Sequence, residues 1–280
     1  MGIGTRSSCW IGTSWKMTKT LAEARDYAGG LAEAILARPE LTDGVQAFII
    51  PPHTALSVVA EELRGLGERR GVGERRGVET QVILGAQNAH WEESGAWTGE
   101  ISVPQAADAG ARLVEIGHSE RREHFGETVE TTRLKVRTVL DHGLQPLLCV
   151  GEPLEVREAG EAEEFILAQA RGALAGLDSA QLARVLLAYE PIWAIGEQGR
   201  PATVEELAEP FAALERVYGA QVEAVLYGGS VNQDNAAELL GIPGVDGLFV
   251  GRAAWELDGY LELLEIGASH VRGAHGRLRE

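Results

Sequence analysis

Eight short apolar runs, each ending in small or polar residues, constrain the fold of this chain more than any other feature. They lie at residues 9–12, 45–50, 82–86, 113–116, 146–150, 185–188, 222–226 and 247–250. The segments between them contain helix-like stretches, and strands that alternate with helices predict βαβ units and a parallel sheet. Eight such units in 280 residues are typical of an α/β protein with a single (β/α)8 barrel domain. We therefore expect one domain over residues 1–280.

The character of the runs and of the segments between them supports this fold. The runs are apolar along their whole length, as expected for strands buried on both faces. A doubly wound open sheet is the alternative, but it needs a phosphate-binding glycine fingerprint after the first strand, and none follows residues 9–12. Residues 20–37, 131–140 and 162–174 have helical apolar spacing, and Thr203 is a candidate N-cap for a further helix.

One segment departs from the pattern. Residues 66–78 read LGERRGVGERRGV, a near-perfect duplication of a six-residue unit. The segment is rich in glycine and charge and lacks apolar periodicity, so we expect an extended charged surface loop over residues 65–79. The alternative is a basic contact patch, because the segment contains four arginines.

Composition limits the partners of the chain. The net charge of −17 argues against nucleic-acid binding and repels anions at long range, so an anion site must be built locally from backbone N–H groups and a few cations. The two cysteines, Cys9 and Cys149, lie in apolar segments, which fits a reducing compartment. Neither a signal peptide nor a membrane span is evident. We expect a cytoplasmic protein with no nucleic-acid or membrane partner.

Glu190 is the first candidate for chemistry. It follows an apolar run and precedes Pro191, and the carboxyl ends of buried strands are where α/β folds place their active sites. Residues 191–199 are apolar in the middle with glycines on the far side, a composition suited to a lid that excludes water from a carboxylate base. A salt-bridged structural glutamate beside an ordinary loop is the alternative.

Lys16 and His118 follow two other runs. A lysine at a strand end can meet an anion or a developing oxyanion. His118 lies between Gly117 and Ser119, at an expected helix start that disfavours positive charge, so we expect a neutral imidazole that donates a hydrogen bond. A solvated lysine and a structural histidine are the alternatives. Glu120 is expected to pair with a cation, and Lys16 is one candidate.

Glycine-rich segments follow the last two runs, at residues 227–232 and 250–254. Barrels often build a phosphate site there, because glycines let backbone N–H groups approach an oxyanion closely. The remaining histidines lack metal-ligand spacing, and no nucleotide-hydrolysis loop is present. We expect no metal and no cofactor.

These segments resemble the triosephosphate isomerase family. The matching pieces keep the family's order over nearly the whole chain: GTSWKM at 12–17, QN at 87–88, GAWTGEIS at 95–102, GHSERR at 117–122, FGE at 125–127, CVGE at 149–152, YEPIWAIG at 189–196, YGGSV at 227–231, and residues 246–251. GHSERR and YEPIWAIG are the most specific. The resemblance implies a TIM barrel with sugar-phosphate isomerase activity.

The resemblance also implies residue roles. Glu190 would move a proton between adjacent carbons of a small phosphorylated ketose, His118 would polarise the carbonyl as a neutral electrophile, and Lys16 would stabilise the negative charge. These are the roles that the corresponding residues have in the family. The phosphate would be held through backbone N–H groups, at Gly196, Ser230, Gly251 and Arg252. Residues 95–102 resemble the family's interdigitating dimer loop, which implies a homodimer with Thr98 reaching the partner's site.

Three departures from the family pattern affect the expected substrate. Ser14 stands where triose enzymes have Asn, and residues 197–201 lengthen the lid by one residue. Arg252 adds a bulky cation to the last glycine loop, where it either strengthens the phosphate site or points away and pairs with an acid. The opening around Ser14 in particular resembles the branch of the family that isomerises L-erythrulose 1-phosphate to D-erythrulose 4-phosphate.

In that substrate a hydroxymethyl group replaces one hydrogen of the triose, and its hydroxyl could bind Ser14. A small apolar addition changes specificity by only roughly 10–200-fold, so we expect residual triose activity. The alternative is a triosephosphate isomerase that interconverts dihydroxyacetone phosphate and glyceraldehyde 3-phosphate. A more distant alternative is a non-catalytic barrel that binds a phosphorylated ligand. Activity on L-erythrulose 1-phosphate implies a role in erythritol catabolism. Activity on dihydroxyacetone phosphate implies a role in glycolysis and gluconeogenesis.

Overall fold

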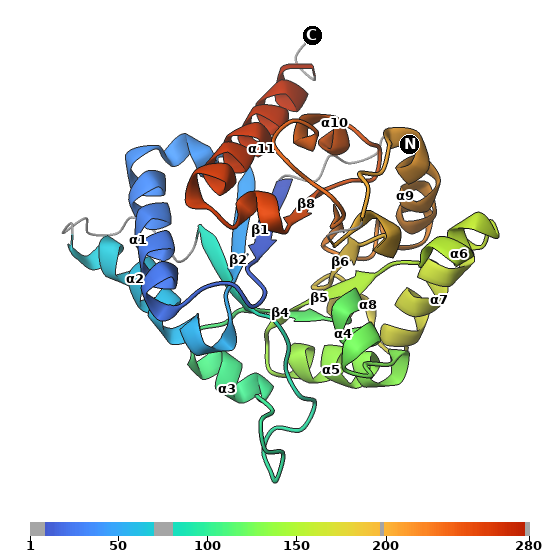
Figure 1. Ribbon diagram of the computed structural model, residues 1–280, viewed down its shortest axis with the longest axis horizontal. Helices are drawn as coiled ribbons and strands as arrows, with labels where there is room; N and C mark the ends of the chain where they lie inside the picture. The colour runs from blue at the N-terminus through green and yellow to red at the C-terminus, as the bar shows by residue number, and fades with distance from the viewer. Residues whose placement is uncertain (1–8, 70–80, 197–198, 278–280) are drawn as a thin grey trace.

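The computed structural model describes residues 9–69, 81–196 and 199–277, and its centre is a closed barrel of eight parallel strands (Figure 1). The strands pair in sequence order, and β8 closes the barrel against β1. They are β1 Cys9–Ser14, β2 Val45–Ile50, β3 Val82–Ala86, β4 Leu113–Ile116, β5 Gln145–Val150, β6 Leu186–Tyr189, β7 Ala224–Tyr227 and β8 Gly247–Val250. The (β/α)8 barrel expected from the sequence is confirmed, with strand ends shifted by at most two residues.

Helices surround the barrel and cover the outer face of its strands (Figure 1). They are α1 Leu21–Ala37, α2 Leu56–Arg69, α3 Val103–Asp108, α4 Ser119–His124, α5 Val129–Asp141, α6 Leu154–Glu158, α7 Ala162–Ala173, α8 Ser179–Leu182, α9 Val204–Tyr218, α10 Ala236–Leu240 and α11 Leu257–Arg277. Thr20 and Thr203 each cap a helix in a reciprocal capping box, with Glu23 and Glu206 respectively. Such caps satisfy N–H groups that the first helical turn leaves free.

Apolar side chains form two clusters separated by the strands. One fills the barrel interior and includes Trp10, Phe48, Leu113 and Phe249, while the larger one lies between the strands and the helices. Successive residues of a strand point to opposite faces. Because Leu113 of β4 points into the barrel, Glu115 points into it as well, so a carboxylate lies among apolar neighbours.

The segment expected as a charged loop at residues 65–79 is partly helical. Residues 65–69 form the end of α2, and residues 70–79 lie outside the described residues. The expectation was wrong for residues 65–69, where α2 continues through Gly65 and Gly67 despite their low helix propensity, because no proline interrupts it. Within the described part of the chain, none of the helices is both long enough and apolar enough to cross a membrane.

Candidate active site

A cavity of about 570 Å³ opens at the carboxyl ends of the strands. Lys16, His118 and Glu190 all line it, although they follow β1, β4 and β6 respectively. The structure therefore brings together the three residues singled out as chemical candidates. The remaining lining residues come largely from the segment after Glu190 and from the glycine-rich loops after β7 and β8.

Glu190 is a buried carboxylate with a free oxygen. Its residue is 2% exposed, and its backbone N–H donates to the carbonyl of Val150, which fixes the strand end. The Oε2 atom has no hydrogen-bond partner among the described residues and lies 3.8 Å from Nε2 of His118. Gly228 makes this placement possible, because a Cβ atom there would lie 2.7 Å from Cγ of Glu190.

His118 caps the short helix α4 with its own side chain. Its Nδ1 accepts a hydrogen bond from the backbone N–H of Glu120 at 3.2 Å. An imidazole nitrogen that accepts is unprotonated, so this contact favours the neutral ring with its proton on Nε2. That proton faces the cavity and Glu190, where it can be donated to a ligand oxygen.

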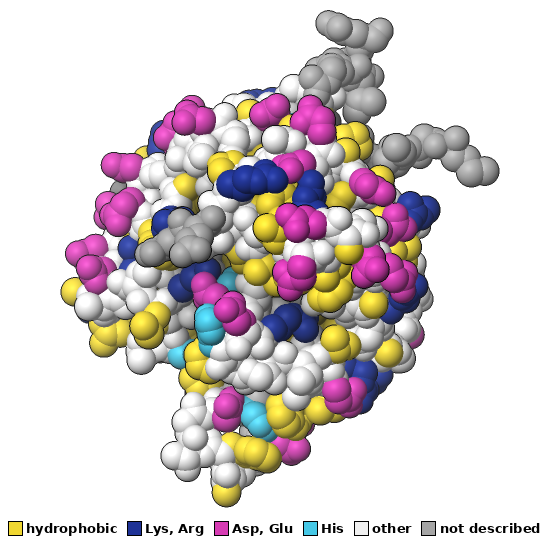
Figure 2. Space-filling view, turned by 45° about the vertical axis from the view of Figure 1, so that its right-hand side comes forward, with side chains coloured by type: hydrophobic (Ala, Val, Ile, Leu, Met, Phe, Trp, Pro, Cys, Tyr) yellow, Lys and Arg dark blue, Asp and Glu magenta, His cyan; other side chains and the backbone are white. Residues whose placement is uncertain are grey.

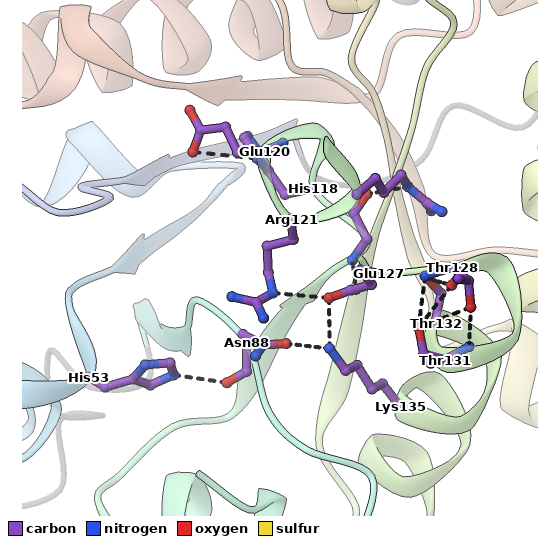
Figure 3. A network of polar contacts seen from close by, with 12 residues as sticks. His53, Asn88, His118, Glu120, Arg121, Glu127, Thr128, Thr131, Thr132 and Lys135 are labelled. Atoms are coloured by element: carbon purple, nitrogen blue, oxygen red, sulfur yellow. Dashed lines mark hydrogen bonds and ion pairs between the residues drawn. The ribbon is translucent and has the colours of Figure 1, made fainter. Parts of the chain in front are cut away.

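A buried polar network anchors the loop that carries His118 (Figure 3). Glu127 accepts hydrogen bonds from the N–H of Gly117 at 2.7 Å, from Nε of Arg121 at 2.9 Å and from Nζ of Lys135 at 2.6 Å. Lys135 also donates to Oδ1 of Asn88 at 2.9 Å. Burial raises the pKa of Glu127, but Lys135 and the three hydrogen bonds outweigh burial and lower it below its usual value. Lys135 was not identified from the sequence, because its partners lie on other elements.

Lys16 is held in a rare backbone conformation. Its φ of +52° makes it the single non-glycine residue with positive φ in the described part of the chain. Gln87 donates to its carbonyl at 2.8 Å, and its Nζ lies 2.6 Å from Oε1 of Glu120. The expected pairing with Glu120 is thus present. Burial raises the pKa of Glu120, and Lys16 outweighs burial and lowers it.

Glu115 provides a second buried carboxylate in this part of the barrel. Ser14 lines the cavity, and its Oγ donates to Oε2 of Glu115 at 3.0 Å. Burial raises the pKa of Glu115 to about 7, with His118 and Lys16 opposing the shift and Glu190 adding to it. Sequence reasoning missed Glu115. A charged residue inside the apolar run 113–116 was the available signal.

The four candidates for phosphate binding line the same cavity: Gly196, Ser230, Gly251 and Arg252. The Oγ of Ser230 donates to the carbonyl of Ala194 at 2.6 Å, and Nη2 of Arg252 donates to the carbonyl of Gly196 at 2.8 Å. Both contacts tie the loops after β7 and β8 to the segment after Glu190. Arg252 therefore points toward the expected lid.

The beginning of the expected lid is held against the barrel. Nε1 of Trp193 donates to Oε1 of Glu152 at 2.7 Å, and the hydroxyl of Tyr189 donates to the same atom at 3.1 Å. The guanidinium groups of Arg157 and Arg200 lie 4.4 Å and 4.7 Å from the centre of the Trp193 ring. Residues 197 and 198 of the lengthened segment lie outside the described residues.

Thr98 does not line the cavity. It is exposed on the long loop between β3 and α3, which projects from the rim of the barrel (Figure 1). The loop is held at its base by a hydrogen bond from the N–H of His90 to the carbonyl of Ile101 at 2.7 Å. The ring of Trp97 lies 4.5 Å from that of His90.

Acidic side chains are spread over the face seen in Figure 2, with Lys and Arg side chains among them. An anion that reaches the cavity therefore depends on nearby groups such as Lys16, Arg252 and the backbone N–H groups of the glycine loops. In the described part of the chain, no three His, Cys, Asp or Glu side chains are grouped to hold a metal ion.

The family model described as triosephosphate isomerase matches residues 9–267. L-erythrulose-1-phosphate isomerase from Mycolicibacterium smegmatis is 62% identical over 263 residues, which cover 94% of each chain. The enzyme of the same name from Mesorhizobium japonicum is 50% identical, with 91% of this chain and 95% of that one covered. A crystal structure of triosephosphate isomerase from Bartonella henselae superposes with a TM-score of 0.76 at 30% identity, and covers 92% of this chain and 98% of its own.

Proposed function

This chain belongs to the triosephosphate isomerase family, and from that premise we propose that it isomerises L-erythrulose 1-phosphate to D-erythrulose 4-phosphate. The family fixes the reaction class as isomerisation of a sugar phosphate. The choice of a four-carbon substrate follows the names of its relatives, which are 62% and 50% identical to it. It agrees with the substrate expected from Ser14.

The reaction moves a carbonyl by one carbon through an enediolate. In L-erythrulose 1-phosphate the carbonyl carbon lies between the phosphate-bearing carbon and a carbon that carries hydrogen, hydroxyl and hydroxymethyl groups. A base removes that hydrogen as a proton, and the electron pair forms the enediolate. Return of the proton to the former carbonyl carbon leaves the carbonyl next to the hydroxymethyl group. No oxidant, reductant or cofactor is consumed.

Glu190 is our candidate for the base. Its Oε2 is buried and has no hydrogen-bond partner among the described residues, so a substrate C–H group can approach it without displacing one. Burial away from water also strengthens each interaction of the carboxylate with a developing charge. The same carboxyl group can return the proton to the adjacent carbon.

His118 and Lys16 are the candidates for stabilising the enediolate. The Nε2 proton of His118 is available because Nδ1 already accepts from Glu120. A neutral imidazole can donate to the carbonyl oxygen and then to the enediolate oxygen without giving up its proton. Lys16 supplies positive charge at the same end of the cavity. Its side chain is 30% exposed, so it can exchange Glu120 for substrate.

We place the phosphate at the loops after β7 and β8. Backbone N–H groups at Gly196, Ser230, Gly251 and Arg252 are the proposed donors, and all four residues line the cavity. Arg252 adds a cation, which matters in a chain whose net charge of −17 repels a phosphate dianion at long range.

The observation that carries this proposal is the pairing of Glu190 with His118 across 3.8 Å. A barrel that only bound a phosphorylated ligand would gain nothing from a buried carboxylate in its binding cavity, because burying the charge costs free energy and the charge repels an anion. The test is kcat/KM of the purified protein for L-erythrulose 1-phosphate and for dihydroxyacetone phosphate. We expect the four-carbon ketose to be the better substrate. A preference for dihydroxyacetone phosphate would instead support a triosephosphate isomerase.

We also infer a homodimer that uses the loop between β3 and α3. Large apolar side chains are exposed on this loop and elsewhere: Trp97 is 49% exposed, Met17 is 97% exposed and Phe125 is 68% exposed. Met17 directly follows Lys16, so a partner loop that covered it would bring Thr98 near the cavity. Sedimentation of the wild type and of Thr98→Arg tests this, with a shift to monomer expected for the variant. A wild type that sediments as a monomer refutes the inference.

The cytoplasm is the compartment that best suits the two thiols. Cys9 and Cys149 are both free and buried, and burial raises the pKa of Cys9 to about 12. Neither is therefore a reactive thiolate. With L-erythrulose 1-phosphate as substrate, the protein would act in sugar breakdown such as erythritol catabolism.

A further inference from the structure

We propose that Ser14 and Glu115 together recognise the terminal hydroxymethyl group of the four-carbon substrate. Ser14 would contact the substrate hydroxyl, and Glu115 would act as a positioning residue that orients Ser14. This inference rests on the proposed function, and it assigns a role to a buried carboxylate that the proton transfer does not require.

The pair is built by the inward faces of two strands. Ser14 ends β1 and Glu115 belongs to β4, and the two side chains meet at 3.0 Å. Each residue is 3% exposed. Ser14 lines the cavity, whereas Glu115 does not. The carboxylate therefore lies behind the serine and touches the cavity through it.

Glu115 lies close to the reacting groups. His118, Lys16 and Glu190 all influence its charge, and Ser14 is its hydrogen-bond partner. A carboxylate buried in this position costs free energy and repels the base Glu190. An apolar side chain would fill the same space in the barrel without that cost. A role in recognising a polar group of the substrate accounts for its presence.

The direction of the hydrogen bond determines what the pair can recognise. Because the Ser14 proton is donated to Glu115, the Oγ lone pairs are left for a donor in the cavity. The hydroxymethyl group of the four-carbon ketose carries such an O–H. A triose has a hydrogen atom in place of that hydroxymethyl group, so it leaves the Ser14–Glu115 pair without a partner. Sites built to bind a hydroxyl discriminate strongly against an analogue that lacks it.

The experiment compares kcat/KM for the two substrates in wild type, Ser14→Ala, Glu115→Gln and the double variant. With L-erythrulose 1-phosphate we expect each single change to lower kcat/KM by about 10–100-fold, as for loss of a hydrogen bond supported by a charged group. With dihydroxyacetone phosphate we expect changes within about threefold, because this triose lacks the additional hydroxymethyl group that the pair would bind. The double variant should be no worse than Ser14→Ala alone, since the two residues act through one contact.

Thr13→Val is the matched control. Thr13 is the neighbour of Ser14 on β1, is fully buried, and has a hydroxyl without a partner among the described residues. It points away from the barrel interior, so its loss should leave the substrate ratio unchanged. The inhibition constant of inorganic phosphate should also be unchanged in the Ser14 and Glu115 variants, because the phosphate lies at other loops.

The inference is overturned if Ser14→Ala and Glu115→Gln lower kcat/KM equally for both substrates, or if neither changes the ratio. Circular dichroism establishes that each variant is folded, and Ser14→Ala decides the matter if Glu115→Gln does not fold. Failure of the proposed function has a different signature, since the wild type itself would then prefer dihydroxyacetone phosphate.

Discussion

Glu190 and His118 face each other across 3.8 Å, from Oε2 to Nε2, although they follow different strands and lie 72 positions apart in the sequence. Among the described residues, Oε2 of Glu190 has no hydrogen-bond partner, and Nδ1 of His118 accepts from the backbone N–H of Glu120. One group is thus free to accept a proton and the other to donate a hydrogen bond, at the same end of one cavity.

Replacing Glu190 by Gln should abolish most turnover and preserve binding. The amide has nearly the same shape but cannot accept the substrate proton, so we expect kcat to fall by about 10²–10⁴-fold or more. The inhibition constant of inorganic phosphate should change little, which shows that the cavity is intact. Near-normal turnover in this variant would rule out Glu190 as the base.

Glu115→Gln should change how stability depends on pH. Burial raises the pKa of Glu115 from 4.5 to about 7, so the folded chain binds this proton more tightly than the unfolded chain. The resulting stabilisation is complete below pH 4.5 and is lost as pH rises through 7. Between those values the free energy of unfolding of the wild type should fall by about 3 kcal/mol relative to the variant.

Urea unfolding at several pH values measures this difference. Thr13→Val serves as the control, and its stability should run parallel to that of the wild type as pH changes. A wild type that runs parallel to Glu115→Gln would show that the pKa of Glu115 is not raised.

Loss of Lys135 should destabilise the fold near His118. Lys135 and Glu127 have side chains only 6% and 1% exposed and meet at 2.6 Å, so Lys135→Met leaves a buried carboxylate with less compensation. Removing one partner of a buried pair typically costs about 3–5 kcal/mol. Chemical denaturation checks this. Arg133→Gln, in the more exposed Arg133–Glu130 pair, is the control and should unfold at the wild-type midpoint.

Arg252→Gln should weaken phosphate binding. Arg252 lines the cavity and donates to the carbonyl of Gly196, so its removal takes away both a cation and a contact with the segment after Glu190. We expect KM and the inhibition constant of inorganic phosphate to rise by about tenfold, as for loss of one charge-assisted contact. Arg25→Gln is the control, because Arg25 pairs with Glu62 instead. Unchanged KM and inhibition constants would show that Arg252 does not contribute to phosphate binding.

The fold could be predicted because buried parallel strands are apolar along their length. Each of the eight runs corresponds to a strand, and the reserved alternative, an open sheet, is excluded by the pairing of β1 with β8. The boundary of α2 was less predictable. Residues 65–69 include Gly65 and Gly67, which favour a loop, but α2 extends through them to Arg69.

The site was predictable only where chemistry follows a strand end. Glu190, His118 and Lys16 share that signal, and they meet because the carboxyl ends of parallel strands lie at one edge of the barrel. Glu115 and Lys135 have no such signal. Glu115 sits inside a strand and meets Ser14 of a distant strand only when the barrel closes. Lys135 sits inside a helix, and its contact with Asn88 also depends on the packing of another element. The direction of Arg252 likewise depends on a contact with Gly196.

Isotope incorporation tests the proposed chemistry most directly. The purified protein is given L-erythrulose 1-phosphate in D2O, and the product is followed by NMR. Transfer through a glutamate that exchanges with solvent predicts D-erythrulose 4-phosphate with deuterium on the carbon next to the phosphate-bearing carbon, and no label formed by Glu190→Gln. The absence of product, or equal labelling by wild type and Glu190→Gln, would contradict it.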